Sequence, residues 1–340
     1  MATIRAWAAA SAGARLEPFD YDPGPLGPED VEVEIDHCGV CHSDLSMLDN
    51  EWGISAYPFV PGHEAIGRVA ALGELAADRG LKLGQRVGIG WNVRSCLYCR
   101  QCLRGQHHLC ERVQPTIVGH HGAFAERVRA HWLWTIPIPE GLDPSATGPL
   151  LCGGITVFAP LADLEVPPTA RIGVFGIGGL GHMALMFGQA WGCEVTAFTS
   201  SPDKADEARA FGARNVVSSR DSQAMAGLAG QFDYLFVTAN APLDWDAIIA
   251  MLAPQGRLHF LGAVLEPVPV HVMNLLLGAK AVSASPTGSR AVIDAMLGFA
   301  ARHEVKPKVE HFPMSRVNEA MEHLRAGKAS YRIVLDADFG

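Results

Sequence analysis

Apolar and polar positions follow two different patterns along the chain, and the pattern changes near residue 150. In the first part, residues 31–35 alternate between apolar and polar side chains, as in a strand with one buried face. Residues 65–71 and 86–90 resemble further strands bounded by glycine, and proline and glycine recur throughout. This part is therefore predicted to be a strand-rich domain with many loops.

From about residue 150 onward, apolar strands alternate with helical segments. The predicted strands are short apolar runs at residues 172–175, 194–198, 215–217, 234–237 and 257–261. Helix-like runs such as residues 201–211 lie between them. This alternation predicts an α/β fold with a doubly wound parallel sheet. After about residue 289 the pattern gives one more helix and a closing strand over residues 331–335.

Length and charge limit the classes of function. A chain of 340 residues is long enough for two domains, and a net charge of −9 without a block of basic residues argues against nucleic-acid binding. The first residues have no long apolar core and include Arg15, so no export signal is expected. The apolar stretch over residues 172–192 is interrupted by glycines and reads as strand, turn and helix. We therefore expect a cytoplasmic protein without a membrane span.

Four cysteines form the most informative motif. Cys96, Cys99, Cys102 and Cys110 are spaced as C-x2-C-x2-C-x7-C. Four thiolates at such spacing can surround one tetrahedral zinc ion and leave no open coordination position, which is typical of a structural site. A pair of disulfides and an iron–sulfur cluster are the alternatives; an unexported chain disfavours the first, and the spacing disfavours the second.

A glycine-rich loop follows the strand predicted at residues 172–175. The sequence Gly176-Ile177-Gly178-Gly179-Leu180-Gly181 is a G-x-G-x-x-G motif that opens a predicted helix. In this context the motif predicts dinucleotide binding, with the pyrophosphate at the helix N-terminus. The alternative is a glycine turn that serves packing alone.

The end of the next strand indicates which dinucleotide binds. No acidic residue stands there; the strand ends in Thr199, Ser200 and Ser201. An acid at this position usually binds the ribose of NAD and would repel a 2′-phosphate. Hydroxyl groups, with Lys204 or Arg209 adding positive charge, favour NADP over NAD.

Three further fragments contain candidate metal ligands. Cys41, His63 and Cys152 lie far apart in the sequence, and each alone is an ordinary buried residue. Together they offer two thiolates and one imidazole, a ligand set known for catalytic zinc with one open position.

At this point the chain resembles the zinc-dependent medium-chain alcohol dehydrogenases. It is most similar to their cinnamyl alcohol dehydrogenase branch, which includes bacterial broad-range aldehyde reductases. The motifs GVCHSDL, PGHEAIGRV, LLCGGITVF, GIGGLGHMAL and YRIVLD occur in family order around the four-cysteine segment. The resemblance covers essentially the whole chain. It implies a GroES-like catalytic domain over residues 1–150 and 287–340 with a zinc lobe at about 91–115, a Rossmann domain over residues 151–286, and a homodimer.

The resemblance also implies roles at matching positions. Cys41, His63 and Cys152 would hold the catalytic zinc, with Glu64 beneath it and Asp44 orienting His63. Ser43 would begin a proton relay. Cofactor contacts are implied for His42, Thr156, Gly176, Gly178, Gly179, Leu180, Gly181, Thr199, Ser200, Ser201, Lys204 and Thr238.

Two features depart from the family pattern. Ser46 stands where many relatives have a histidine, and a bulky apolar pair is missing near residues 285–287. Motif spacing places Trp52, Ile54 and Trp91 at the substrate channel, although either tryptophan could equally be a core residue.

The function implied is hydride transfer between NADP(H) and primary alcohols or aldehydes, aromatic ones included, with two zinc ions per subunit. One alternative is an NAD-dependent dehydrogenase of simple alcohols or polyols. Another is a nucleotide-binding sensor without catalysis, against which the four residues Cys41, His63, Glu64 and Cys152 speak.

Overall fold

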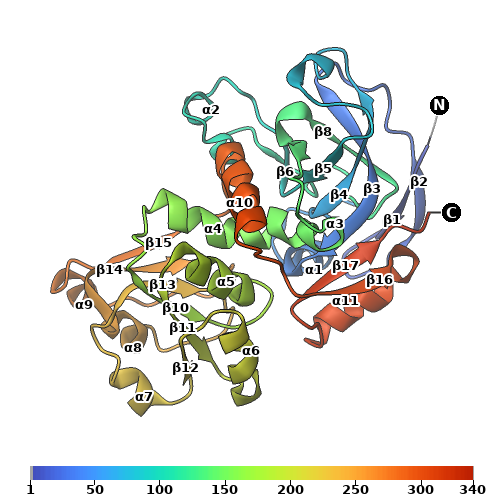
Figure 1. Ribbon diagram of the computed structural model, residues 1–340. Coiled ribbons are helices and arrows are strands. Elements are labelled where there is room, and N and C mark those ends of the chain that lie inside the picture. The colour runs from blue at the N-terminus through green and yellow to red at the C-terminus, as the bar shows by residue number, and fades with distance from the viewer. Residues whose placement is uncertain (1–2, 340) are drawn as a thin grey trace. The chain divides into compact units, whose positions relative to one another are not determined.

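The computed structural model describes residues 3–339, which form two compact units (Figure 1). The first unit contains the residues up to 155 and those from 287 onward, and the second contains residues 156–286. The sequence prediction had placed the first boundary after residue 150. In the structure the boundary falls between residues 155 and 156, within α4 (Gly153–Asp163).

The first unit is built on a sheet of seven described strands. Their order is β16-β17-β3-β4-β5-β9, with β8 paired to β3, and every pair except β16 with β17 is antiparallel. The strands are β3 (Asp30–Val40), β4 (Ala65–Leu72), β5 (Arg86–Ile89), β8 (Arg127–His131), β9 (Ile136–Pro137), β16 (Val309–Pro313) and β17 (Arg332–Asp336). Two smaller pairs are β1 (Ile4–Ala8) with β2 (Glu17–Tyr21), and β6 (Asn92–Arg94) with β7 (Gln114–Pro115).

Strand β3 shows how far the alternating pattern holds. Val31, Val33 and Ile35 are buried in the core, and Glu34 is exposed. Glu32 is also buried, against the pattern, because Arg127 and Arg129 of the neighbouring strand β8 donate hydrogen bonds to its two carboxylate oxygens at 3.0 and 2.8 Å. A buried charge is tolerated when it is paired in this way.

The helices of the first unit are short. They are α1 (His42–Leu48), α2 (Arg100–Leu103), α3 (Pro144–Thr147), α10 (Arg290–Arg302) and α11 (Val317–Arg325). Helix α10 begins where the sequence predicted it: the Ser289 hydroxyl accepts a hydrogen bond from the Val292 amide at 3.3 Å, which satisfies a free donor of the first turn.

The second unit is a doubly wound sheet. Its described strands lie in the order β12-β11-β10-β13-β14-β15, and all are parallel. They are β10 (Arg171–Phe175), β11 (Glu194–Thr199), β12 (Asn215–Ser218), β13 (Phe232–Val237), β14 (Leu252–Phe260) and β15 (Ala281–Ala284). The connecting helices are α5 (Gly181–Trp191), α6 (Ala205–Ala210), α7 (Ser222–Ala226), α8 (Trp245–Ala250) and α9 (Val272–Leu276). The prediction of a Rossmann-type sheet is confirmed.

The segment predicted as one helix over residues 201–211 is divided. A 3₁₀ turn over Pro202–Lys204 precedes α6. A proline in this first turn has no amide hydrogen to donate, which suits a short irregular start better than a helix interior.

No single helix among the described residues is both long and apolar enough to cross a bilayer. One bent pair of helices, Pro144–Leu151 with Gly153–Asp163, is long and apolar enough only when the two are taken together.

Candidate active site and metal centres

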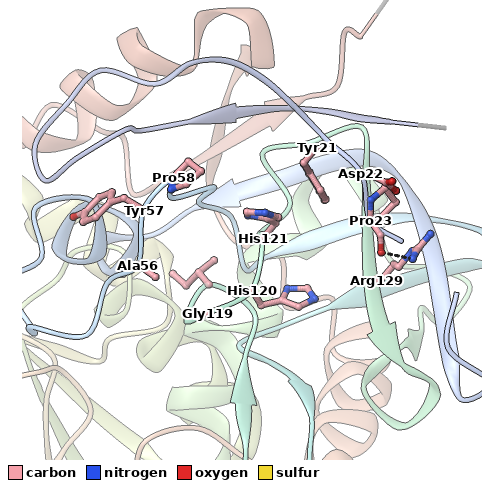
Figure 2. Close-up of a pocket in the computed structure, with 11 residues that line it drawn as sticks. Tyr21, Asp22, Pro23, Ala56, Tyr57, Pro58, Gly119, His120, His121 and Arg129 are labelled. Atoms are coloured by element: carbon pink, nitrogen blue, oxygen red, sulfur yellow. Dashed lines mark hydrogen bonds between the residues drawn. The ribbon is translucent and has the colours of Figure 1, made fainter. Parts of the chain in front are cut away.

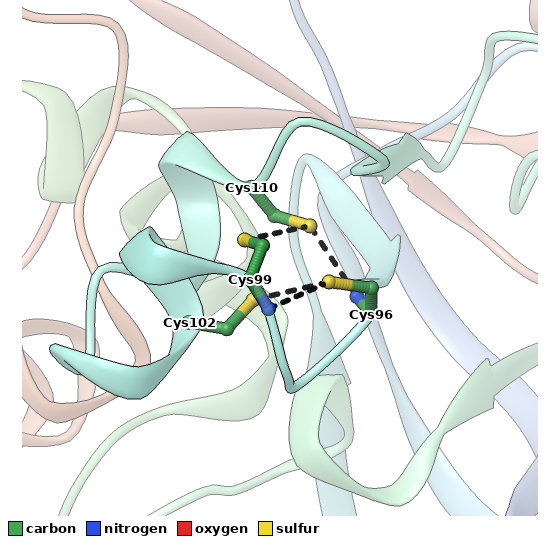
Figure 3. Close-up of side chains that lie close together, drawn as sticks. All are labelled: Cys96, Cys99, Cys102 and Cys110. Atoms are coloured by element: carbon green, nitrogen blue, oxygen red, sulfur yellow. Dashed lines mark hydrogen bonds between the residues drawn. The ribbon is translucent and has the colours of Figure 1, made fainter.

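Four thiols converge in the loop that carries α2 (Figure 3). The sulfur atoms of Cys96, Cys99, Cys102 and Cys110 all lie within 4.8 Å of one another. The Sγ–Sγ distances are 4.0 Å for Cys96–Cys102 and 3.9 Å for Cys99–Cys110. Sulfur atoms bound to one tetrahedral zinc ion are about 3.8 Å apart, whereas a disulfide needs about 2 Å. The geometry fits a closed zinc site, and the disulfide alternative is wrong.

Backbone amides in this loop donate hydrogen bonds to the cysteine sulfurs and so favour the thiolate form. The amides of Cys96 and Arg112 donate to the Cys110 sulfur, and the Cys99 amide donates to the Cys96 sulfur, each at 3.3 Å. The backbone amide of Cys102 is the largest cause that lowers the pKa of Cys99 to about 6. Hydrogen bonds to a charged form favour that form, and thiolates are what a zinc ion requires.

A second group of ligands lies at the centre of the first unit. Cys41, His63, Glu64 and Cys152 bring one ligand atom each within 4.8 Å of the others. Cys41 precedes α1, His63 and Glu64 precede β4, and Cys152 follows a 3₁₀ turn over Gly148–Leu151. The fold thus brings together three fragments that are distant in sequence.

Asp44 fixes the histidine of this group. Its Oδ1 lies 3.0 Å from Nδ1 of His63, and both side chains are fully buried. Among the described residues, Nε2 of His63 has no hydrogen-bond partner. An imidazole whose Nδ1 is held by a carboxylate and whose buried Nε2 is left free is the arrangement of a metal ligand with its outer partner. Burial opposes protonation of His63, but Asp44 and Cys41 outweigh it and hold its pKa well above the ordinary value.

The two thiols complete a set that fits a metal ion. The sulfur atoms of Cys41 and Cys152 are 4.0 Å apart. Their mutual hydrogen bond is the largest cause that lowers the pKa of Cys41 and raises the pKa of Cys152. Two sulfurs at this distance and one free imidazole nitrogen match a zinc site that keeps a fourth position open.

Glu64 forms a buried ion pair that the sequence reasoning did not include. The Arg332 guanidinium donates to Oε1 of Glu64, and both side chains are almost inaccessible, at 5% and 0% exposure. Burial raises the pKa of Glu64, although Arg332 opposes that change. Among the described residues, Oε2 of Glu64 has no partner. The sequence did contain a clue to this pair. Arg332 begins an otherwise apolar strand, and a buried arginine is rarely without an acidic partner.

Aromatic side chains lie against the second metal group. The Trp91 ring meets the His63 ring edge-on at 4.9 Å, and Trp52 packs against Trp91 at 6.1 Å. The Ser43 hydroxyl lies 3.7 Å from the Cys41 sulfur, while Ile54 is 52% exposed and His42 is exposed at the start of α1. Ser46 is buried. Both tryptophans are partly buried and pack against the core of the first unit, and Trp91 also contacts the candidate ligand His63.

The glycine loop of the second unit has the geometry that phosphate binding requires. Gly176 has a φ of +90°, a backbone conformation that favours glycine. A Cβ on Gly181 would lie 1.8 Å from the Gly176 carbonyl oxygen, so there is no space for a larger residue. The local backbone therefore explains both glycines without a ligand. A Cβ on Gly178 would meet no atom within 4 Å. Packing does not explain Gly178, and close approach of a ligand does. Gly179 and Leu180 complete the turn into α5, whose first residue is Gly181.

Hydroxyl and amine groups surround this loop. The Thr238 hydroxyl donates to the carbonyl oxygen of Gly176 at 2.6 Å, and Lys204 Nζ donates to that of Ile177 at 3.3 Å. At the end of β11, the Thr199 hydroxyl accepts from the Ser201 amide at 3.1 Å, and Ser200 is exposed. All of these groups lie at or after the carboxyl ends of neighbouring parallel strands in the second unit, β10, β11 and β13.

Two other expected cofactor residues have different surroundings. Arg209 is bonded to Asp206 of the same helix at 3.1 Å and is thereby partly neutralised. Thr156 donates to the Pro286 carbonyl oxygen at 3.3 Å, at the point where the chain enters and leaves the second unit.

A pocket of about 460 Å³ opens on the first unit, and its lining includes none of the residues that the sequence singled out as a site (Figure 2). Its wall includes Tyr21 and His121, whose rings are 4.3 Å apart, and His120, whose Nδ1 lies 3.1 Å from the Thr116 carbonyl oxygen. Arg129 at its rim is engaged by Glu32 and by backbone carbonyls. The pocket has no group of metal ligands and no phosphate-binding loop.

The second unit has a Rossmann sheet with a phosphate loop, and the first unit has an open set of two thiols and one imidazole; together these features define a metal-dependent dehydrogenase. Comparisons with known proteins agree. The sequence model of the alcohol dehydrogenase GroES-like domain matches residues 27–140, and that of the zinc-binding dehydrogenases matches residues 179–302.

Individual relatives cover nearly the whole chain. Aldehyde reductase AdhA of Synechocystis sp. is 52% identical over 332 residues, or 98% of each chain. The structure of the cinnamyl alcohol dehydrogenase SbCAD4 of Sorghum bicolor matches with a TM-score of 0.93 at 34% identity, over 98% of both chains. That of the Helicobacter pylori enzyme complexed with NADP(H) matches with a TM-score of 0.89 at 27% identity, also over 98% of both. The chain belongs to the zinc-dependent medium-chain alcohol dehydrogenases, in their cinnamyl alcohol dehydrogenase-like branch, and is an oxidoreductase of alcohols and aldehydes.

Proposed function

We propose that this chain reduces aldehydes to primary alcohols with NADPH, and catalyses the reverse oxidation, at a zinc ion held by Cys41, His63 and Cys152. The observation that carries the proposal is the orphaned Nε2 of the fully buried His63 beside two thiols that are 4.0 Å apart. The relatives support the direction: one is an aldehyde reductase, and another was crystallised with NADP(H).

The bound groups supply the central chemistry: zinc acts as a Lewis acid on the substrate oxygen, and NADPH supplies the hydride. The protein's side chains do the rest. Asp44 keeps the His63 ring oriented, which a metal-bound histidine needs. Ser43, which lies 3.7 Å from the Cys41 sulfur, delivers the proton to the substrate oxygen. Glu64, with its free Oε2, serves as an alternative ligand when water or substrate exchanges.

The choice of NADPH rests on the end of β11. Ser200 and Ser201 offer hydroxyls, no acidic residue stands at the tip, and Lys204 is anchored to the glycine loop. Hydroxyls and an ammonium group suit a 2′-phosphate, whereas a carboxylate would repel it. His42, Thr156, Thr238 and the glycine loop complete the proposed cofactor contacts.

The substrate class follows from the two tryptophans. Trp91 contacts the His63 ring and Trp52 contacts Trp91, so an aldehyde whose oxygen reaches the metal position has aromatic faces beside it. Ring stacking favours planar aromatic substrates. Ile54, which is more than half exposed, lines the mouth of this channel.

A second zinc ion, held by Cys96, Cys99, Cys102 and Cys110, stabilises the lobe and takes no part in the reaction. We place the enzyme in the cytoplasm, since all eight cysteines are free thiols and thiols persist in reducing compartments. We also infer a homodimer. Apolar side chains on α9 and β15 of the second unit are exposed without a partner: Val272, Met273, Leu276, Leu277 and Val282.

Substitution of Cys41 tests the metal assignment. Cys41→Ala is expected to lower the zinc content from two ions to one per chain and to reduce aldehyde reduction at least about a thousandfold, because Lewis-acid stabilisation is lost. NADPH binding, followed by its fluorescence, should be unchanged. Cys193→Ala, which removes a buried thiol of the second unit, is the matched control and should keep both zinc ions. Turnover that survives Cys41→Ala would place the reaction elsewhere.

A further inference from the structure

The carboxyl ends of β11 and β12 form one edge of the cofactor sheet. The two strands are parallel and in register, with Thr199 opposite Ser218. The Ser219 amide donates to the Thr199 carbonyl oxygen at 2.9 Å, so the pairing continues past the end of β12. The segments that follow the two strands therefore run side by side: Ser200 lies beside Ser219, and Arg220 is the next residue after Ser219. Ligands of such sheets bind at this edge.

The basic groups at this edge differ in whether they are already engaged. Lys204 Nζ is bonded to the glycine loop, and Arg209 is paired with Asp206. The guanidinium of Arg220 has no hydrogen-bond or ion-pair partner among the described residues, and the side chain is exposed. Only its backbone amide is used, in a bond to the Ser218 hydroxyl at 3.3 Å.

The acidic groups nearby do not cancel this charge. Asp221, the next residue, turns its Oδ1 to the Ala224 amide at 2.9 Å and caps α7. Asp206 is engaged by Arg209 on α6, and Asp203 is exposed beside Lys204. A guanidinium without a partner among the described residues thus stands on the segment that runs beside the end of β11, whose hydroxyls the proposed function assigns to the 2′-phosphate.

We propose that Arg220 binds the 2′-phosphate of NADPH from the neighbouring strand and, together with Lys204, sets the preference for NADPH over NADH. This inference rests on the proposed function. A guanidinium presents a planar fork that matches a phosphate, and it stays charged at every working pH. Arg220 is a specificity-determining residue that acts on binding and not on the hydride step.

Binding of adenosine phosphates tests the proposal without turnover. Calorimetric titration with 2′,5′-ADP, which carries the 2′-phosphate, and with 5′-AMP, which lacks it, compares wild type with Arg220→Gln. Arg220→Gln is expected to weaken 2′,5′-ADP binding about tenfold, as for one charge-assisted contact. Binding of 5′-AMP should stay the same, and the salt dependence of 2′,5′-ADP binding should become shallower, because fewer charges meet the phosphate.

Two variants make the outcomes distinct. Arg214→Gln removes an exposed arginine that precedes β12 and is paired with Glu194 at 3.3 Å, and it should leave both affinities unchanged. Lys204→Gln should weaken 2′,5′-ADP. If Lys204→Gln weakens 2′,5′-ADP and Arg220→Gln does not, Arg220 has no part in the site while the cofactor preference stands. If wild type binds 2′,5′-ADP no better than 5′-AMP, the NADPH preference itself fails, and the role of Arg220 fails with it.

Discussion

Asp44 makes three contacts with its two carboxylate oxygens, and each contact fixes a different part of the metal group. Oδ1 accepts a hydrogen bond from the Gly62 amide at 2.8 Å and lies 3.0 Å from the His63 ring nitrogen, while Oδ2 accepts from the Cys41 amide at 2.9 Å. One buried residue therefore positions two ligands from separate loops. Preorganisation of this kind is what lets a ligand set close on a metal without reordering the chain.

The buried pair of Glu64 and Arg332 gives a prediction for stability. Arg332→Met leaves the Glu64 carboxylate buried without a partner, so the variant should lose about 3–5 kcal/mol of unfolding free energy. Urea denaturation with zinc present measures this. Arg316→Met, which breaks the exposed Arg316–Glu319 pair, is the control and should cost far less, because solvent screens an exposed pair. Equal losses in the two variants would mean that the buried pair carries no special energy.

The candidate ligands were predictable from sequence because cysteine and histidine in short motifs are rare and chemically specific. Arg332 was not, since its partner lies 268 residues away and an arginine before an apolar strand has no fixed spacing to a glutamate. Arg220 was not predicted for a related reason. The segment that carries it lies beside Ser200 because β12 pairs with β11, and hydrophobic periodicity does not predict which strands pair.

At the scale of elements, the strands were easier to predict than the helix starts. Buried parallel strands are continuous apolar runs, so β10, β11 and β13 stand out in the sequence. The segment after β11 instead begins with a 3₁₀ turn over Pro202–Lys204, and α6 follows it. The buried Glu32 of β3 likewise depended on arginines of another strand.

The pairing of β14 with β15 contains a histidine that should make stability pH-dependent. His259 lies between the hydroxyls of Ser283 and Ser285 at 2.8 and 2.9 Å, and it is 2% exposed. Burial, with a smaller effect of Arg257, lowers its pKa to about 4. The unfolded chain takes up a proton below about pH 6.5 and the folded chain only below about 4, so the unfolding free energy falls as the pH drops through this window.

The expected loss from this histidine is about 2 kcal/mol between pH 7 and pH 5. Urea denaturation of wild type and His259→Asn at both pH values, with saturating zinc, measures the difference. The variant should be less stable at pH 7 but lose less on acidification. An identical pH dependence in the two proteins would show that His259 is not the titrating group.

At the scale of the whole molecule, the metal ligands and the phosphate loop belong to different units. The metal ligands all come from the first unit, and the phosphate loop with its hydroxyl-bearing edge comes from the second. The return of the chain to the first unit after residue 286 explains why that unit cannot be read as one continuous block.

The exposed apolar side chains of α9 and β15 predict the oligomeric state. Leu277 is 80% exposed and Met273 is 58% exposed, which is unusual for a free surface unless another chain covers it. Light scattering after size exclusion should give twice 36.3 kDa for wild type and 36.3 kDa for the double variant Met273→Glu, Leu277→Glu. Leu83→Glu, at an exposed leucine of the first unit, should remain a dimer. A monomeric wild type would contradict the inference.

The central claim is an NADPH-dependent aldehyde reduction at the candidate zinc site, and one measurement addresses it directly. Initial rates of NADPH and NADH oxidation are recorded in parallel with zinc-loaded protein and cinnamaldehyde or benzaldehyde. The account predicts rapid turnover with a higher kcat/KM for NADPH than for NADH. Turnover that favours NADH would keep the enzyme class and contradict the cofactor assignment. No turnover with either cofactor would contradict the aromatic aldehyde as substrate.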